Sequence, residues 1–252
     1  MSSSPHLDIV TAAVLVIGDE ILSGRTLDQN SHYIAQYLSR IGVDLREARV
    51  VPDVEAEIVA AVNALRARYT YVFTTGGIGP THDDITADAI ARAFGVPIAE
   101  DPRAIAMLLE RIPADRLNAA RRRMARIPVG AELVENSVSK APGFMIGNVV
   151  VMAGVPLIMQ AMLDAVAPRL KTGAKMLVET IPGEGLHEGR YAAGLEALAA
   201  AHPEVSMGSY PQFSASGVTA EIVLRARDAA VLKTAADAVR DLLTRLRVDP
   251  AF

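Results

Sequence analysis

A continuous apolar run at residues 12–17, AAVLVI, limits the fold of this chain more than any other stretch. A strand with one face in water alternates apolar and polar side chains, so this run predicts a strand that is covered on both faces. Ile34, Leu38 and Ile41 then have helical spacing before Gly42, and residues 43–51 indicate a second strand. Alternating patterns of this kind predict an α/β domain.

Further strands and helices follow in the same alternation. Asp53 is a candidate cap for a helix on which Ile58, Val62 and Leu65 recur, and Asp101-Pro102 is a candidate start for another. We expect the remaining strands at 71–73, 132–134 and 149–152, the remaining helices at 86–94, 115–126 and 158–170, and a turn-rich segment at 136–147.

A polar segment at residues 171–175 predicts a domain boundary, with one domain at residues 1–171 and a second at residues 172–252. The second domain has a strand-helix-strand-strand-helix pattern. Its expected elements lie at residues 176–181, 190–201, 205–213, 218–226 and 229–246. A βαββα order indicates a small α+β domain with an antiparallel hairpin.

Residues 74–86, TTGGIGPTHDDIT, form a glycine-rich turn between a strand and a helix. Gly76, Gly77 and Gly79 lack the Cβ atoms that would keep a phosphate away from backbone N–H groups. The N-terminus of the next helix would favour the same anion. The loop therefore predicts a phosphate site, although a lone glycine turn after a strand is also compatible with a plain tight turn.

Carboxylates follow several strand ends. Asp19 and Glu20 come after the first strand, Asp53 after the second, and Asp84 closes the glycine loop beside Asp83. Parallel neighbouring strands would bring these groups to one crevice, where Mg²⁺ prefers oxygen ligands. The alternatives are that Asp53 and Asp84 cap helices, that Asp19 and Glu20 are a solvated strand end, and that Asn30 bonds only within its own turn.

Composition restricts the partners. The chain of 252 residues has a net charge of −4 and no cysteine, and no apolar run approaches the roughly 20 residues that span a bilayer. We therefore expect a cytoplasmic protein without membrane or nucleic-acid partners. Arginines at positions 121, 122, 123 and 126 indicate mainly a solvated helix face.

Four segments carry a family resemblance: GDEILSGRTLDQNS, TTGGIGPTHDDIT, APGF and AGVP, in this order. Residues 10–170 resemble the molybdopterin-binding domain family of MoaB and Mog, and most closely its subgroup at the N-terminus of CinA, the competence/damage-inducible protein, with a related domain in eukaryotic FAD synthases. The remainder resembles the KH-like domain of CinA. The resemblance implies a three-layer α/β/α fold and a homo-oligomer, either a dimer or a trimer.

The resemblance also implies a small phosphate-bearing ligand, either molybdopterin or a nucleotide. The implied activity is divalent-metal-dependent hydrolysis of a pyrophosphate such as ADP-ribose or FAD; the alternatives are a binding module without chemistry and molybdopterin adenylyl transfer. Asp84 and Asp53 would be catalytic, and both would bind metal together with Asp19. The residues expected to bind the ligand are Gly76, Gly77, Gly79, Thr75, Gly18, Asn30, Pro142 and Gly143.

The sequence departs from the CinA pattern at two places. The chain stops at Phe252, so we expect neither the amidohydrolase domain of CinA nor deamidation of pyridine nucleotides. Ser139-Lys140 stands where CinA-like sequences have a glycine before APGF, and Lys140 is a candidate phosphate contact. The second domain also lacks the GxxG loop with which KH domains clamp RNA, so no RNA binding is expected.

Overall fold

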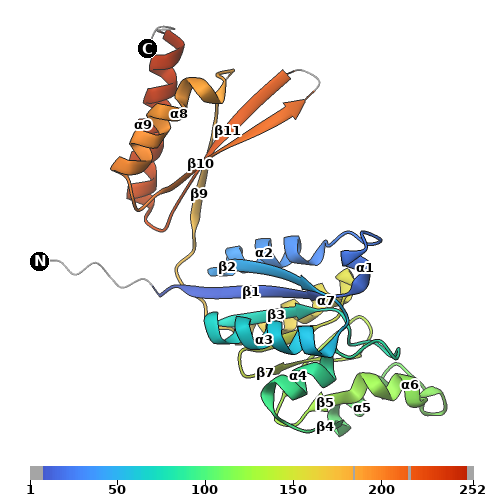
Figure 1. Ribbon diagram of the computed structural model, residues 1–252. Helices are drawn as coiled ribbons and strands as arrows, with labels where there is room; N and C mark the ends of the chain where they lie inside the picture. Colours follow the sequence, from blue (N-terminus) through green and yellow to red (C-terminus); the bar gives the residue numbers. More distant parts are fainter. Residues whose placement is uncertain (1–7, 184, 215–216, 249–252) are drawn as a thin grey trace, which may run out of the picture. The chain divides into compact units, whose positions relative to one another are not determined.

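A six-stranded sheet forms the centre of the first of two units, Met1–Gly173 and Ala174–Phe252. The computed structural model describes residues 8–183, 185–214 and 217–248. The strand order is β2-β1-β3-β8-β7-β6 (Figure 1). The first four neighbours are parallel: β2 (Val43–Val51), β1 (Val10–Ile17), β3 (Tyr71–Thr75) and β8 (Val149–Met152). β7 (Gly143–Ile146) runs antiparallel to both β8 and β6 (Glu132–Val134).

The parallel strands end at the same level. Ile17 pairs with Val51, and Thr75 pairs with both Val16 and Met152. The segments that follow these strands therefore leave the sheet at one edge, where ligands bind in open α/β sheets.

The side chains of β1 divide between two apolar cores, as the uninterrupted apolar run predicts. Ala13, Leu15 and Ile17 pack in the core that contains residues of α3 (Glu55–Arg68) and α4 (Thr86–Phe94). Ala12, Val14 and Val16 pack in the core that contains residues of α2 (Asn30–Ile41) and α7 (Pro156–Val166). The predicted three-layer α/β/α fold is therefore confirmed.

The predicted helix at residues 115–126 is wrong. The segment contains only a short helix, α6 (Ala119–Arg122), with a 3₁₀ turn on either side. Asn118 caps α6 by accepting a hydrogen bond from the N–H of Arg121. Arg126 then enters β5 (Arg126–Pro128), which pairs with β4 (Ile98–Glu100). These two short strands and β7 were missed. The helix before this segment is α5 (Pro102–Leu109), capped by Asp101 as predicted.

The second unit has the predicted βαββα order. Its elements are β9 (Leu177–Pro182), α8 (Glu188–Ala201), β10 (Ser206–Ser214), β11 (Gly217–Ala226) and α9 (Ala229–Val248). The strands form an antiparallel sheet in the order β10-β11-β9, and one apolar core joins this sheet to the two helices. Within the described residues of the chain, no helix is long and apolar enough to cross a bilayer.

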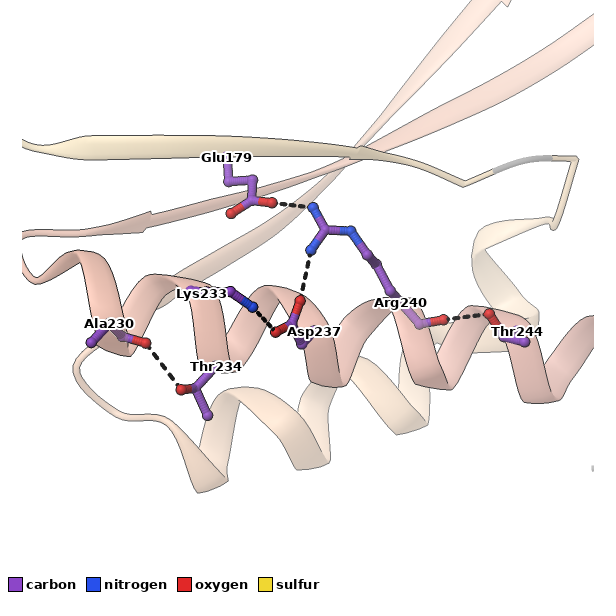
Figure 2. A network of polar contacts seen from close by, with 7 residues as sticks. All are labelled: Glu179, Ala230, Lys233, Thr234, Asp237, Arg240 and Thr244. Atoms are coloured by element: carbon purple, nitrogen blue, oxygen red, sulfur yellow. Dashed lines mark hydrogen bonds and ion pairs between the residues drawn. The ribbon is translucent and has the colours of Figure 1, made fainter.

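Ion pairs attach α9 to β9 in this unit. Arg240 of α9 donates to the carboxylate of Glu179 on β9 and, at 3.1 Å, to Asp237 one turn earlier (Figure 2). Asp237 also accepts from Lys233 at 2.5 Å. All four side chains are at least 30% exposed, so these pairs fix the position of α9 along β9 more than they stabilise the fold.

Candidate functional site

The glycine loop begins where β3 ends, and it requires glycine at two positions. Gly76 and Gly77 have φ values of 102° and 66°. A Cβ atom would lie 2.1 Å from the carbonyl oxygen of Ile17 at Gly76, and 2.2 Å from Thr86 Oγ1 at Gly77. Thr86, the first residue of α4, secures the turn, because its hydroxyl donates to Gly76 O and its N–H donates to Gly77 O, each at 3.0 Å.

Asp84 is held within the loop and does not cap α4. Its Oδ2 accepts from the N–H and the hydroxyl of Thr81, at 2.7 and 2.5 Å. The carboxylate also lies against Gly79, where a Cβ atom would approach Oδ2 to 2.7 Å and Oδ1 to 3.0 Å. No side chain caps α4, so the interpretation of Asp84 as a helix cap is wrong. The bonds to Thr81 orient the carboxylate and leave Oδ1 available to a ligand.

Asp53 reaches the same loop from β2. Its Oδ2 accepts from the N–H of Asp19 at 3.1 Å, and its Oδ1 lies 3.6 Å from the position of a Cβ atom on Gly77. No side chain caps α3, so Asp53 is not the cap of that helix either. Burial raises the pKa of Asp53, the N–H of Asp19 lowers it, and the carboxylates of Asp19, Glu20 and Asp83 raise it again. The energetic cost of a negative charge at Asp53 favours a cation nearby.

The described residues contain no cluster of three histidine or carboxylate side chains that would hold a metal ion. Of the three expected ligands, Asp53 lies next to Asp19, from whose backbone N–H it accepts a hydrogen bond, and Asp84 accepts hydrogen bonds from Thr81. Mg²⁺ commonly takes only one or two carboxylates, with phosphate oxygens and water as its other ligands. Asp53 and Asp84 fit that smaller set, and Asp19 is the residue that the geometry supports least.

A cavity of about 790 Å³ opens beside the glycine loop. It is lined by the loop glycines, by the charged residues Glu20, Asp84 and Arg111, and by apolar side chains. The apolar residues include Leu108, Ile112, Met124, Ile158 and Met162. A volume in this range, lined by apolar side chains and a few polar groups, is typical of a site for a small organic ligand.

The predicted ligand residues divide into three groups. Those that line the cavity are Gly76, Gly77, Gly79, Asp84 and Pro142. Thr75 and Asn30 line a smaller adjoining pocket. Gly18, Asp19, Asp53 and Gly143 line neither space. Gly143 instead allows β7 to approach β8, because a Cβ atom there would lie 2.3 Å from Val151 O.

Arg111 was missed by the sequence analysis. It follows α5 and lines the cavity, where it is the only cationic residue among the lining residues that the structure describes. Its position was not predictable, because no sequence pattern relates the end of α5 to the glycine loop. Of the four arginines at positions 121, 122, 123 and 126, Arg122 pairs with Glu100 and Arg126 with Asp88, whereas Arg123 donates to the carbonyl oxygen of Asp84 in the glycine loop at 3.4 Å.

Lys140 is not a phosphate contact in this structure. Its ammonium group pairs with Glu110 at 2.7 Å, and this hydrogen bond raises the pKa of Lys140. Lys140 is also the only described non-glycine residue with positive φ, at 64°. Glycine adopts that conformation without strain, which explains in physical terms why glycine suits the segment before APGF.

Lys140→Gly is therefore expected to raise the melting temperature by about 1–4 °C, since removal of left-handed strain outweighs the added freedom of the unfolded chain. Thermal unfolding followed by circular dichroism measures this shift. Glu110→Gln is the matched control for the exposed ion pair and should change the melting temperature by less than about 2 °C. A lower melting temperature for Lys140→Gly than for Glu110→Gln would contradict the strain argument.

Comparison with known proteins identifies the family. Residues 13–172, more than half of the chain, match the family model described as a probable molybdopterin binding domain. The chain belongs to the molybdopterin-binding domain family. A solved structure of CinA from Thermoplasma acidophilum, described as a protein of unknown function, is 34% identical with a TM-score of 0.61, and the match covers 64% of this chain and 98% of that one.

Two curated proteins are also similar to this chain. A CinA-like protein of Desulfosudis oleivorans is 36% identical over 78% of this chain and 47% of its own length. A probable FAD synthase of Caenorhabditis elegans is 30% identical over 92% of this chain and 50% of its own length. The chain thus spans about half the length of these two relatives. Residues 185–251 match the middle domain of FAD synthase.

Proposed function

We propose that this protein hydrolyses a pyrophosphate-bridged nucleotide, such as ADP-ribose or FAD, with the help of a divalent cation. The observation that carries the proposal is that the carboxylates of Asp53 and Asp84 lie against Gly77 and Gly79 of a glycine loop, and that this loop and Asp84 line a large cavity. Relatives named CinA-like protein and probable FAD synthase support a nucleotide ligand.

Each part of the loop has a role in the proposed reaction. Gly76, Gly77 and Gly79 admit the phosphates close to the backbone, and Asp53 and Asp84 hold the cation through one or two carboxylate oxygens. Such a cation supplies a Lewis acid that neutralises charge on the phosphoryl oxygens. Arg111 at the cavity wall offsets negative charge on the ligand as well.

The proposed hydrolysis consumes only the nucleotide and one water molecule. The oxygen of water forms a bond to one phosphorus atom, the bridging P–O bond breaks, and two phosphate monoesters and protons are released. Asp53 and Asp84, whose carboxylates lie against Gly77 and Gly79, would orient water or accept its proton.

Asp53→Asn is expected to stabilise the protein at pH 7. The folded state raises the pKa of Asp53, so its ionised form costs stability above the folded pKa, and this cost is absent below the unfolded pKa of about 3.9. The variant should melt above the wild type at pH 7 and at the wild-type temperature near pH 3. Melting curves across this pH range measure the difference.

Asp53→Asn also tests whether Asp53 binds the proposed cation. Mg²⁺ together with ADP should raise the melting temperature of the wild type more than that of Asp53→Asn, because the cation loses a charged partner. A variant that is less stable than the wild type at pH 7, or equally stabilised by Mg²⁺ and ADP, would contradict this role of Asp53.

Ligand screening by thermal unfolding tests the proposed ligand class. ADP-ribose, FAD, ATP and molybdopterin are compared with and without Mg²⁺, because a ligand that binds only the folded state raises the melting temperature. We expect ADP-ribose or FAD to give the largest shift, and a larger one with Mg²⁺ than without. A shift with molybdopterin alone would overturn the proposed ligand class.

A second candidate is a binding module without chemistry. The observation that favours it is that Asp84 lines the cavity whereas Asp53 does not. This candidate predicts that a bound nucleotide is not hydrolysed, whether or not Mg²⁺ is present. Metal-dependent turnover of any bound nucleotide would exclude it.

A further inference from the structure

A small pocket of about 60 Å³ adjoins the main cavity at the end of β1 and β3. The two spaces share five lining residues: Glu20, Thr26, Gly76, Gly154 and Pro156. We call the smaller space the side pocket. The two spaces therefore lie side by side next to the glycine loop.

Two buried oxygen atoms on the lining residues of the side pocket have no hydrogen-bond partner. They are Oδ1 of Asn30 and Oγ1 of Thr75, on residues that are 7% and 1% exposed. Asn30 donates from Nδ2 to Gly154 O at 2.8 Å, which fixes the orientation of its amide and leaves Oδ1 as an acceptor. Buried acceptors of this kind are normally paired, so each requires a donor that the described residues do not supply.

We infer that the side pocket binds a hydrogen-bond donor of the nucleotide, a hydroxyl or an amino group, which Asn30 Oδ1 and Thr75 Oγ1 accept. This inference rests on the proposed function and specifies the ligand further. One water needs about 10–15 Å³ measured in the same way, so the side pocket has room for roughly four to six groups of that size and is too small for the purine of a nucleotide. The rings of the ligand then occupy the main cavity, where Leu108, Met124 and Met162 supply apolar contacts.

The side pocket would thus determine selectivity. A ligand that carries the donor satisfies both oxygens, whereas an analogue without it leaves them buried and unpaired. Sites that hydrogen-bond a substrate hydroxyl or amino group reject the analogue that lacks it much more strongly than apolar pockets reject a missing methylene. A ribose hydroxyl and the amino group of adenine share this chemistry, and nucleotide analogues distinguish them.

Titration calorimetry of the full chain with Mg²⁺ tests the inference. The probes are ADP, 2′-deoxy-ADP, 3′-deoxy-ADP and inosine diphosphate, which lacks the amino group. We expect one of the three analogues to bind at least about 10-fold more weakly than ADP. A deoxy analogue with that loss identifies a ribose hydroxyl as the donor, and inosine diphosphate identifies the amino group.

Thr75→Val and Thr74→Val form a matched pair of variants. Both threonines lie on β3, are buried, and have a hydroxyl without a partner, but only Thr75 lines the side pocket. Valine keeps the branched shape that a strand favours. The preference for ADP should fall at least about threefold in Thr75→Val and stay unchanged in Thr74→Val.

The outcomes separate the inference from the proposed function. If the wild type binds ADP and all three analogues equally, or if Thr75→Val keeps the full preference, the side pocket holds only water and the inference fails while nucleotide binding stands. If the wild type binds none of the four nucleotides, both the inference and the proposed function fail.

Discussion

Asp84→Asn is expected to lower Mg²⁺-dependent hydrolysis of ADP-ribose or FAD at least about 100-fold and to leave the fold intact. Asparagine keeps an oxygen that can accept the two hydrogen bonds from Thr81, so the loop should retain its conformation. It removes the negative charge at the position beside Gly79. Initial rates at saturating Mg²⁺, with melting temperatures of both proteins, measure the two effects separately.

Asp83→Asn is the matched control for that variant. The carboxylate of Asp83 is adjacent in sequence but is 66% exposed and does not line the cavity. Its charge is screened by water and salt, so we expect a rate within about threefold of the wild type. Equal rates for the wild type and Asp84→Asn would refute the catalytic role of Asp84, and equal losses in both variants would indicate a general effect of loop charge.

Gly76→Ala is expected to cause the largest loss of stability, roughly 3–5 kcal/mol. Its φ of 102° is unfavourable for alanine, and the added Cβ would lie 2.1 Å from a backbone oxygen at the end of the central strand. Because neither backbone segment is a flexible side chain, the glycine loop must shift away from β1. Urea unfolding measures the change, and nucleotide binding should be lost with it.

Gly95→Ala separates the clash from the backbone strain. Gly95 ends α4 with a φ of 66°, but a Cβ atom there would meet nothing within 4 Å. This control should therefore cost only about 1 kcal/mol, the usual penalty of left-handed backbone for alanine. A Gly76→Ala variant as stable as Gly95→Ala would show that the loop does not require close contact with Ile17.

The sequence predicted the parallel part of the fold because long apolar patterns determine it. Residues 43–51 and 86–94 were predicted with the bounds that the structure has, and each is bordered by a glycine. Two short strands, at 132–134 and 149–152, were also predicted with their observed bounds, whereas those at 98–100, 126–128 and 143–146 were missed. Arg126 belongs to a three-residue strand that depends on pairing with Glu100 and on the contact with Asp88, and both partners are distant in sequence.

The candidate site, like the fold, could be predicted from the sequence only in part. The order of strand ends correctly predicted that Asp53 and the glycine loop lie together, since parallel strands end at one edge. The direction of each side chain was not predictable. Asp84 turns to Thr81, Lys140 pairs with Glu110, and Arg111 reaches the cavity from the end of α5. These positions depend on local hydrogen bonds and on packing between distant segments.

Phosphorus NMR of the full chain with ADP-ribose, and separately with FAD, tests the central claim most directly. With Mg²⁺, the pyrophosphate resonances should disappear and two phosphate monoester resonances should grow in equal amounts, while the sample without a divalent cation should not change. Persistence of the pyrophosphate in both ligands at concentrations where they bind would contradict the proposed hydrolysis and leave a binding module.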